Sequence, residues 1–241
     1  MIKELKVIAT IHTDFPEKFG IPRQSGLVKS AKGTIVFEPE YRIAEAFRGL
    51  SGYSHIWVIW GFSKVEKRHF SATVKPPRLG GKKRMGVFAT RSPFRPNPIG
   101  LSAVKLTGIV MNEKLGPLLQ VEGVDMLDGT PVYDIKPYLP YADSYPDAKD
   151  GFAGEVFEHR LTVCYEEGSL EKLPGYLREA LTEILREDPR TAYIEDEKRV
   201  WGLAYAGYNI RFTVAKNLLR VCEVTALDNN SPGGHPADGN N

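Results

Sequence analysis

The sequence predicts a mainly β protein with some α structure, made of an N-terminal β-barrel-like domain and a small α+β C-terminal domain, and not a Rossmann fold. Three observations lead to this prediction. Short apolar runs of strand type recur through residues 1–140, with a single helical pattern among them. A stretch rich in Pro, Asp, Gly and Tyr follows at residues 140–154, as is typical of a domain boundary. Beyond it, one amphipathic helix pattern lies among further strand patterns.

The elements of the N-terminal domain can be assigned in order. Residues 5–13 alternate and are β-branched, which predicts a strand, and residues 14–32 hold enough Pro and Gly to predict a long loop. Residues 40–50 place Tyr41, Ala44, Phe47 and Leu50 on one face and predict a short helix. The remaining expected strands are residues 33–38, 55–62, 85–90, 99–110, 117–127 and 131–139, with a basic loop at 63–85.

The C-terminal part has its own pattern. Residues 156–165 predict a strand, and residues 174–188 predict an amphipathic helix that begins at Pro174 and ends before Pro189. Residues 200–205 and 209–214 predict a hairpin, and residues 219–227 a last strand. Residues 228–241 have almost no apolar content. We therefore expect a barrel domain at 1–150, an α+β domain at 151–227 and a flexible tail at 228–241.

Composition narrows the classes of protein. Of the 241 residues, 42% are hydrophobic and 26% charged, enough for a packed core. No apolar run reaches membrane-helix length and the first residues lack a signal-type apolar block, so we expect a cytoplasmic protein without membrane contact. The two cysteines, Cys164 and Cys222, predict no disulfide framework, although a single bridge stays open. The five histidines have no metal-ligand spacing, and we expect no metal.

Positive charge is concentrated in one stretch. Residues 64–95 contain ten Lys or Arg and one Glu, a net charge of +9, while the rest of the chain has 22 basic and 29 acidic residues, or −7. A concentrated positive stretch of this kind suits binding to a polyanion. The competing interpretation is a solvated, Lys-rich loop.

The usual nucleotide and hydrolase motifs are missing. The sequence contains no G-x-G-x-x-G, P-loop, G-x-S-x-G or H-E-x-x-H pattern. It does contain four loops with unusual side chains, at residues 22–26 (PRQSG), 76–81 (PPRLGG), 91–100 (RSPFRPNPIG) and 125–131 (DMLDGTP). Each loop alone is explained by turn chemistry, but four of them in one small β domain, two with arginine in the basic stretch, favour a binding site.

Several long blocks resemble a known family. They include FPEKFGIPRQSGLVKSAKG, RGLSGYSHIWVIWGFS, FATRSPFRPNPIG and DGTPVYDIKPYLP, and the resemblance covers residues 5–150 and, more loosely, continues to 226. The chain is similar in these blocks to the tRNA N6-threonylcarbamoyladenosine methyltransferases. The resemblance implies a homodimeric β-barrel enzyme that transfers a methyl group from S-adenosylmethionine to N6 of threonylcarbamoyladenosine at tRNA position 37, next to the anticodon.

The resemblance also implies a set of cofactor-binding residues. These are Pro22, Arg23, Gln24, His55, Ile56, Arg91, Leu101, Asp125, Met126, Leu127 and Asp128. Their chemistry is compatible with the cofactor, because an arginine can pair with its carboxylate and an aspartate can accept from its ribose hydroxyls or amino group.

The acceptor side offers weaker candidates. Asn97, Asp134 and Tyr138 could orient or accept the N–H proton of the target, although each also suits a structural role. Tyr133, Tyr138 and Tyr141 could stack on loop bases, with core packing as the alternative. For phosphate contacts with the anticodon loop we expect Arg78, Lys82, Lys83, Arg84 and Arg95. Two other functions stay open: a nonenzymatic RNA-binding module, and a methyltransferase with a different acceptor.

Overall fold

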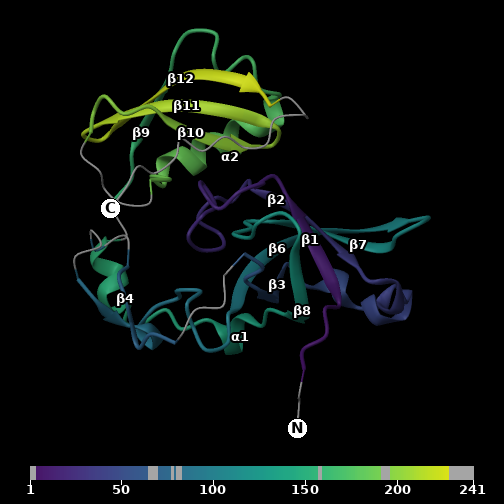
Figure 1. Cartoon of the computed structure of the whole chain (residues 1–241). Coiled ribbons are helices and arrows are strands. Elements are labelled where there is room, and N and C mark those ends of the chain that lie inside the picture. Colours follow the sequence, from purple (N-terminus) through teal and green to yellow (C-terminus); the bar gives the residue numbers. More distant parts are fainter. Residues whose placement is uncertain are drawn as a thin grey trace.

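A computed structural model describes residues 4–64, 70–76, 79, 83–156, 159–190 and 196–227. The strands form two separate larger sheets, a closed barrel and a four-stranded sheet (Figure 1). The predicted fold class is confirmed: the chain is mainly β, with a barrel followed by a small α+β region. The expected tail at 228–241 lies outside the described residues.

The barrel closes through six antiparallel strand pairs in the order β1-β2-β7-β6-β3-β8. The strands are β1 (Ala9–Thr13), β2 (Lys32–Phe37), β3 (His55–Gly61), β6 (Ile99–Asn112), β7 (Gly116–Glu122) and β8 (Thr130–Pro137). Alternate residues point inward, as the period of a strand requires, and pack into a hydrophobic interior. Buried residues from all six strands include Ile11, Ile35, Ile56, Val58, Val104, Leu119, Val121 and Val132.

Residues 40–50 do not form the α-helix that their apolar spacing predicts. Three short 3-10 helices lie there instead: η1 (Pro39–Tyr41), η2 (Ala44–Phe47) and η3 (Leu50–Gly52). Gly49 has a φ of 85°, a left-handed conformation that interrupts any helix. Among the four apolar positions only Phe47 is buried, against Phe37, so the segment lacks the continuous buried face that stabilises an amphipathic helix.

Several predicted strands are shorter in the structure. Residues 85–90 form only the two-residue strand β5 (Met85–Gly86), paired with β4 (Thr73–Val74), and then the 3-10 helix η5 (Val87–Ala89). The first strand begins at Ala9 rather than residue 5, and the one expected at 117–127 ends at Glu122. Gly123, with a φ of 79°, bends the chain out of the barrel there.

The boundary predicted at 140–154 contains two short helices, α1 (Pro140–Asp143) and η6 (Gly151–Val156). The C-terminal region then begins with β9 (Thr162–Tyr165), shorter than the 156–165 expected, and α2 (Gly175–Arg186). It continues with β10 (Trp201–Tyr205), β11 (Tyr208–Ala215) and β12 (Leu218–Ala226). Its sheet has the order β10-β11-β12-β9, with β9 parallel to β12. Among the described residues, no helix is long and apolar enough to cross a membrane.

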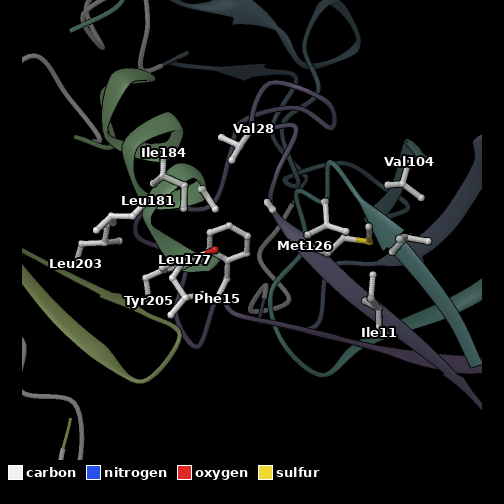
Figure 2. Packing of buried hydrophobic residues seen from close by; sticks show 14 of the residues in the cluster. Ile11, Phe15, Val28, Val104, Met126, Leu177, Leu181, Ile184, Leu203 and Tyr205 are labelled. Atoms are coloured by element: carbon white, nitrogen blue, oxygen red, sulfur yellow. The ribbon is translucent and has the colours of Figure 1, made fainter. Parts of the chain in front are cut away.

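The barrel and the C-terminal region share one hydrophobic core. The buried face of α2, including Leu177, Leu181 and Ile184, belongs to the same cluster as Ile11 of the barrel. Figure 2 shows Phe15 between that helix face and the barrel interior. Its ring lies 5.4 Å from the ring of Tyr205 in β10. The loop that carries Phe15 is therefore packed between the two parts of the molecule.

Candidate functional site

The loop at residues 14–31, here called the N-terminal loop, lies beside the turn at residues 123–129. Gly26 N donates to Gly123 O at 2.9 Å, and Gly123 N donates to Ala31 O at 2.8 Å. At the other end, Asp128 N donates to Phe15 O at 2.9 Å. Two of the four predicted loops are thus held together by backbone hydrogen bonds, which fixes their side chains relative to one another.

Four polar residues from distant parts of the sequence meet at this junction, and we call them the Asp125 cluster: Gln24, Arg91, Ser102 and Asp125. Arg91 Nη1 donates to Gln24 Oε1. Ser102 Oγ donates to Asp125 Oδ1 at 2.6 Å. The carboxylate of Asp125 also accepts a hydrogen bond from the backbone of Ser25, and the positive charge of Arg91 lowers its pKa. Three of the four predicted loops therefore converge, at 22–26, 91–100 and 125–131.

The barrel wall supports the cluster from inside. Ser102 lies on β6 and is 1% exposed, and its Oγ accepts from Trp60 Nε1 at 2.9 Å while donating to Asp125. Gly100 makes room for this indole, because a Cβ there would lie 2.2 Å from Trp60 Cε2. Sequence reasoning missed Ser102 and Trp60, since a Ser within a strand pattern carries no sign of its partner.

The environment shifts the acidity of Asp125. Burial raises the pKa of Asp125 to about 6, against the lowering effects of the Ser102 hydrogen bond, backbone hydrogen bonds and the positive charge of Arg91. Part of the residue still reaches the surface. At neutral pH the group is thus mainly a carboxylate, able to accept hydrogen bonds from hydroxyl or ammonium groups of a ligand. Perturbed acids of this kind gather at functional sites.

The remainder of the 125–128 turn is mostly structural. Met126 is fully buried and Leu127 is 8% exposed, so their side chains pack in the core. Met126 O accepts from Thr13 Oγ1 at 3.0 Å. Asp128 accepts from Thr13 N at 3.1 Å and lies 3.2 Å from His12 Nδ1. Met126 and Leu127 could therefore contact a ligand only through their backbone groups.

Arg23 points away from the Asp125 cluster. Its Nη2 donates to the carbonyls of Asp188 at 3.2 Å and Arg190 at 2.9 Å, in the C-terminal region. Together with Pro22 and Asp188, Arg23 lines a small cavity of about 20 Å³ between the two parts. A guanidinium next to Gln24 in sequence thus contacts the other part of the molecule, and its cofactor role stays a prediction.

The residues predicted from strand β3 lie apart from the cluster, whereas Leu101 directly precedes the cluster member Ser102 on β6 and has its side chain on the opposite face of the strand. His55 is exposed and its Nδ1 is 2.9 Å from Ser54 Oγ, whereas Ile56 is fully buried in the barrel. Leu101 is 55% exposed and pairs with Ile59 on the outer wall. His55 pairs with Lys105, four residues further along β6, so roughly 13 Å of strand separates the two positions.

The three catalytic candidates also have structural partners. Asp134 accepts from Ile135 N at 2.9 Å and lies 2.7 Å from Lys136 Nζ. The ring centroids of Tyr138 and Trp57 lie 5.5 Å apart, so the two rings pack together. Asn97 is exposed, and its carbonyl accepts from Ile99 N at 2.8 Å. Within the described residues none of the three makes a hydrogen bond or ion pair to the Asp125 cluster, and their catalytic roles stay predictions.

Two predicted phosphate contacts, Arg78 and Lys82, lie outside the described residues. Lys83 is exposed. Arg84 donates from Nε to Thr73 Oγ1 at 2.7 Å, and Arg95 donates from Nη1 to Val87 O at 3.1 Å. Both guanidiniums are therefore engaged by protein groups, Arg84 at Thr73 and Arg95 at Val87, which limits how much of each can meet phosphate.

A larger surface cavity lies elsewhere, with a volume of about 350 Å³ between η2 and the β6–β7 hairpin. Its lining includes Phe47, Ile109 and Met111 and none of the predicted cofactor residues. Among the described residues, no group of three or more His, Cys, Asp or Glu could hold a metal ion.

Comparison with known proteins decides the family. The model of the tRNA-methyltransferase O N-terminal domain matches residues 10–144, and that of the TrmO C-terminal domain matches residues 158–227. The chain belongs to the tRNA-methyltransferase O (TrmO) family. This confirms the resemblance found in the sequence blocks.

Individual TrmO relatives agree. The tRNA (adenine(37)-N6)-methyltransferase of Escherichia coli is 42% identical over 221 residues, covering 88% of this chain and 93% of that protein. A putative S-adenosylmethionine-dependent methyltransferase of Pseudomonas aeruginosa is 37% identical, covering 95% of this chain and all of that protein. The crystal structure of TrmO from Pseudomonas aeruginosa superimposes with a TM-score of 0.75 at 32% identity, over 94% of this chain and 100% of that chain.

Proposed function

We propose that this protein is an S-adenosylmethionine-dependent tRNA methyltransferase that methylates N6 of adenosine 37, in its threonylcarbamoyl form. The observation that carries the proposal is the convergence of Gln24, Arg91 and Asp125, from three distant loops, in a member of the TrmO family. The E. coli relative is named for N6 methylation of adenine 37, and the Pseudomonas relative for dependence on S-adenosylmethionine. The threonylcarbamoyl group is inferred from the resemblance of the sequence blocks.

The Asp125 cluster has the donors and acceptors that this cofactor needs. Arg91 is exposed, and within the described residues only its Nη1 is engaged, so Nε and Nη2 keep donors for a carboxylate. Asp125 offers a carboxylate to ribose hydroxyls or to the α-ammonium group. Gln24 orients Arg91 through Oε1, and its amide nitrogen has no hydrogen-bond partner in the part of the chain that the structure describes, so it can donate to polar groups of the ligand. When bound, S-adenosylmethionine supplies a methyl group that is activated by the positive sulfonium.

On the protein side, the main task is to align the acceptor nitrogen with the methyl group, because an in-line displacement depends mostly on distance and orientation. The phosphates of the anticodon loop would be held by the predicted basic residues Arg78, Lys82, Lys83, Arg84 and Arg95. Asn97, on the same loop as Arg91, remains our candidate for orienting the acceptor N–H, with Asp134 and Tyr138 as rivals. Tyr138 and the exposed Tyr141 are the candidates for stacking on bases.

We further propose that the protein is cytoplasmic and that its two domains divide at residue 150. We also propose that it forms a homodimer. Ile99 and Leu101 are 38% and 55% exposed on the outer wall of β6, which gives an apolar surface that a second copy could cover. Light scattering of the purified protein tests the dimer: a mass twice that of the 26.9 kDa chain supports it, and the mass of one chain contradicts it.

Methyl transfer to tRNA tests the activity directly. Wild-type protein is incubated with methyl-labelled S-adenosylmethionine and tRNA from cells that lack this protein, and the product nucleosides are separated. Label in N6-methyl-threonylcarbamoyladenosine supports the proposal, and tRNA without the threonylcarbamoyl group should accept no label. Salt-sensitive tRNA binding without any methylated product would favour a nonenzymatic RNA-binding module. Label only in a small molecule or protein would favour a different acceptor.

A further inference from the structure

We propose that the C-terminal region positions the cofactor-binding loop, and that Arg23 is the positioning residue through which it does so. The inference rests on the proposed function, because it concerns the same Asp125 cluster. The geometry that points to it is the pair of hydrogen bonds from Arg23 Nη2 to the carbonyls of Asp188 and Arg190, directly beside Gln24 in the chain.

The accepting turn at residues 188–190 is held rigidly. Asp188 is 1% exposed and has a φ of 54°, an unusual conformation for a residue other than glycine. Its carboxylate lies 2.7 Å from Arg190 Nε, 2.8 Å from Arg190 Nη2 and 2.9 Å from His159 Nε2. Burial raises the pKa of Asp188, but the hydrogen bonds from Arg190 and His159 and the charge of Arg190 outweigh it and hold the pKa below its usual value. The two carbonyls are thus presented from a fixed ion-pair network.

The same region holds the N-terminal loop at its start and along its length. Ala206 N donates to Asp14 O at 2.9 Å, and Ala204 N donates to Glu17 Oε1 at 3.3 Å. A Cβ at Gly20 would lie 2.1 Å from Leu203 Cδ1, so the loop backbone lies directly against β10.

The loop is also held at its end, where Ser30 N and Ser30 Oγ donate to Glu183 Oε2 at 3.1 and 2.8 Å. One side of the loop is therefore attached to the C-terminal region throughout.

The other side of the loop faces the site. Gln24 accepts from Arg91, and the backbone of Ser25 donates to Asp125. Arg23 is thus one residue from a group that orients Arg91 and two residues from a group that contacts Asp125. Without the tie, this stretch would sample conformations in which Gln24 and Ser25 leave their partners. The apparent cofactor affinity then falls in proportion to the fraction of molecules that keep the binding geometry.

A double-mutant cycle on cofactor binding separates positioning from direct contact. The variants are Arg23→Met, which keeps an apolar stem, Arg190→Gln, and the combination of the two. Arg211→Met is the matched control, because Arg211 forms an exposed ion pair with Glu223 in the same region and has no contact with the loop among the described residues. Affinity for S-adenosylmethionine is measured by calorimetry, and melting temperature confirms that each variant is folded.

We expect Arg23→Met to weaken cofactor binding roughly 5-fold or more, as is usual for coupling between sites. Arg190→Gln should weaken it in the same direction, and the double variant no further than the stronger single variant. The KM for the cofactor should rise while kcat at saturation and the KM for tRNA stay near wild type. Wild-type affinity in Arg190→Gln, or additive losses in the double variant, would overturn the inference and leave Arg23 as a direct cofactor contact.

Hydrogen exchange of the ligand-free protein gives an independent measurement. Arg23→Met should speed amide exchange at residues 24–26, and Arg23→Lys, which keeps one donor group, should restore part of the protection. Unchanged exchange would contradict the tie whether or not the wild type binds the cofactor, which keeps this result separate from a failure of the proposed function. If Arg190→Gln does not fold, Arg190→Lys takes its place in the cycle.

Discussion

Ser102 and Asp125 are joined by a 2.6 Å hydrogen bond between the interior of the barrel wall and a surface turn. Through this bond the rigid strand β6 fixes the direction of a carboxylate that is also near Arg91. The arrangement connects the fold to the proposed chemistry, because a strand of the barrel wall helps to set the position and the acidity of a group at the site.

Cofactor binding should depend on pH through Asp125. The pKa of Asp125 is raised to about 6, so the carboxylate that accepts ligand hydrogen bonds forms as pH rises through this value. We expect affinity for S-adenosylmethionine to increase between pH 5 and pH 7 with a midpoint near 6. Calorimetry across this range checks the expectation, and Asp125→Asn should bind weakly at every pH. A flat profile in the wild type would contradict a role for this carboxylate.

The same shift predicts how stability changes with pH. A raised pKa means that the folded state binds this proton more tightly than the unfolded state, so the stabilising contribution is present below the ordinary pKa of 3.8 and is lost as pH rises through about 6. Asp125→Asn should therefore raise the melting temperature relative to wild type more at pH 8 than at pH 4. Asp147→Asn, at an exposed position, is the control measured at the same two pH values.

Removing the Ser102 hydroxyl should change both stability and acidity. Ser102→Ala removes the hydroxyl that accepts from Trp60 Nε1 and donates to Asp125 Oδ1, which costs about 1–3 kcal/mol of unfolding free energy. Because the Ser102 hydrogen bond lowers the pKa of Asp125, the midpoint of the pH profile should move above 6 in this variant. Denaturant unfolding and the binding profile measure the two effects. A midpoint that moves downward would show that the hydroxyl does not stabilise the carboxylate.

A methyl group at Gly100 should disturb the wall behind the site. The new Cβ would lie 2.2 Å from Trp60 Cε2 inside a packed barrel, so Gly100→Ala should lower the unfolding free energy by about 1–3 kcal/mol. Gly86→Ala is the matched control, since nothing lies within 4 Å of its Cβ position. Equal stability of the two variants in urea titrations would mean that the indole does not occupy this space.

Phe15 should contribute more to stability than its position in a loop suggests. It is fully buried between the barrel and the C-terminal region, and Phe15→Ala should cost about 3–5 kcal/mol. Phe88→Ala removes a ring that is 73% exposed and should cost far less. Thermal unfolding compares the two, and a small effect of Phe15→Ala would show that the two parts do not share a core.

Local patterns predicted much of the fold. Alternation at residues 99–110 and the continuous apolar run at 55–62 correspond to β6 and β3, because barrel strands bury one face along most of their length. The helix at 174–188 was recognised from Leu177, Leu181 and Ile184, which do face the core. The short helix predicted at 40–50, with its end near Gly49, is replaced by three 3-10 helices, because burial of Phe47 alone gives the segment no continuous apolar face.

The site was predictable only in part. Proline and glycine mark the loops at 22–26, 91–100 and 125–131, and in the structure residues of these three loops contact one another, whereas their roles toward a cofactor stay predictions. The role of Ser102 could not be predicted, because the function of a serine within a strand depends on its hydrogen-bond partner, here 23 residues away in the sequence. The direction of Arg23 was also beyond prediction, since it is set by carbonyls more than 160 residues further along the chain.

Calorimetric titration of S-adenosylmethionine into wild type and Arg91→Met tests the central claim most directly. We expect the wild type to bind the cofactor and Arg91→Met to lose at least about tenfold in affinity while remaining folded, because a charge-assisted pair with the carboxylate is removed. Arg211→Met should bind like the wild type. Equal affinity in the wild type and Arg91→Met, or no binding by the wild type, would contradict the assignment of the Asp125 cluster as the cofactor site.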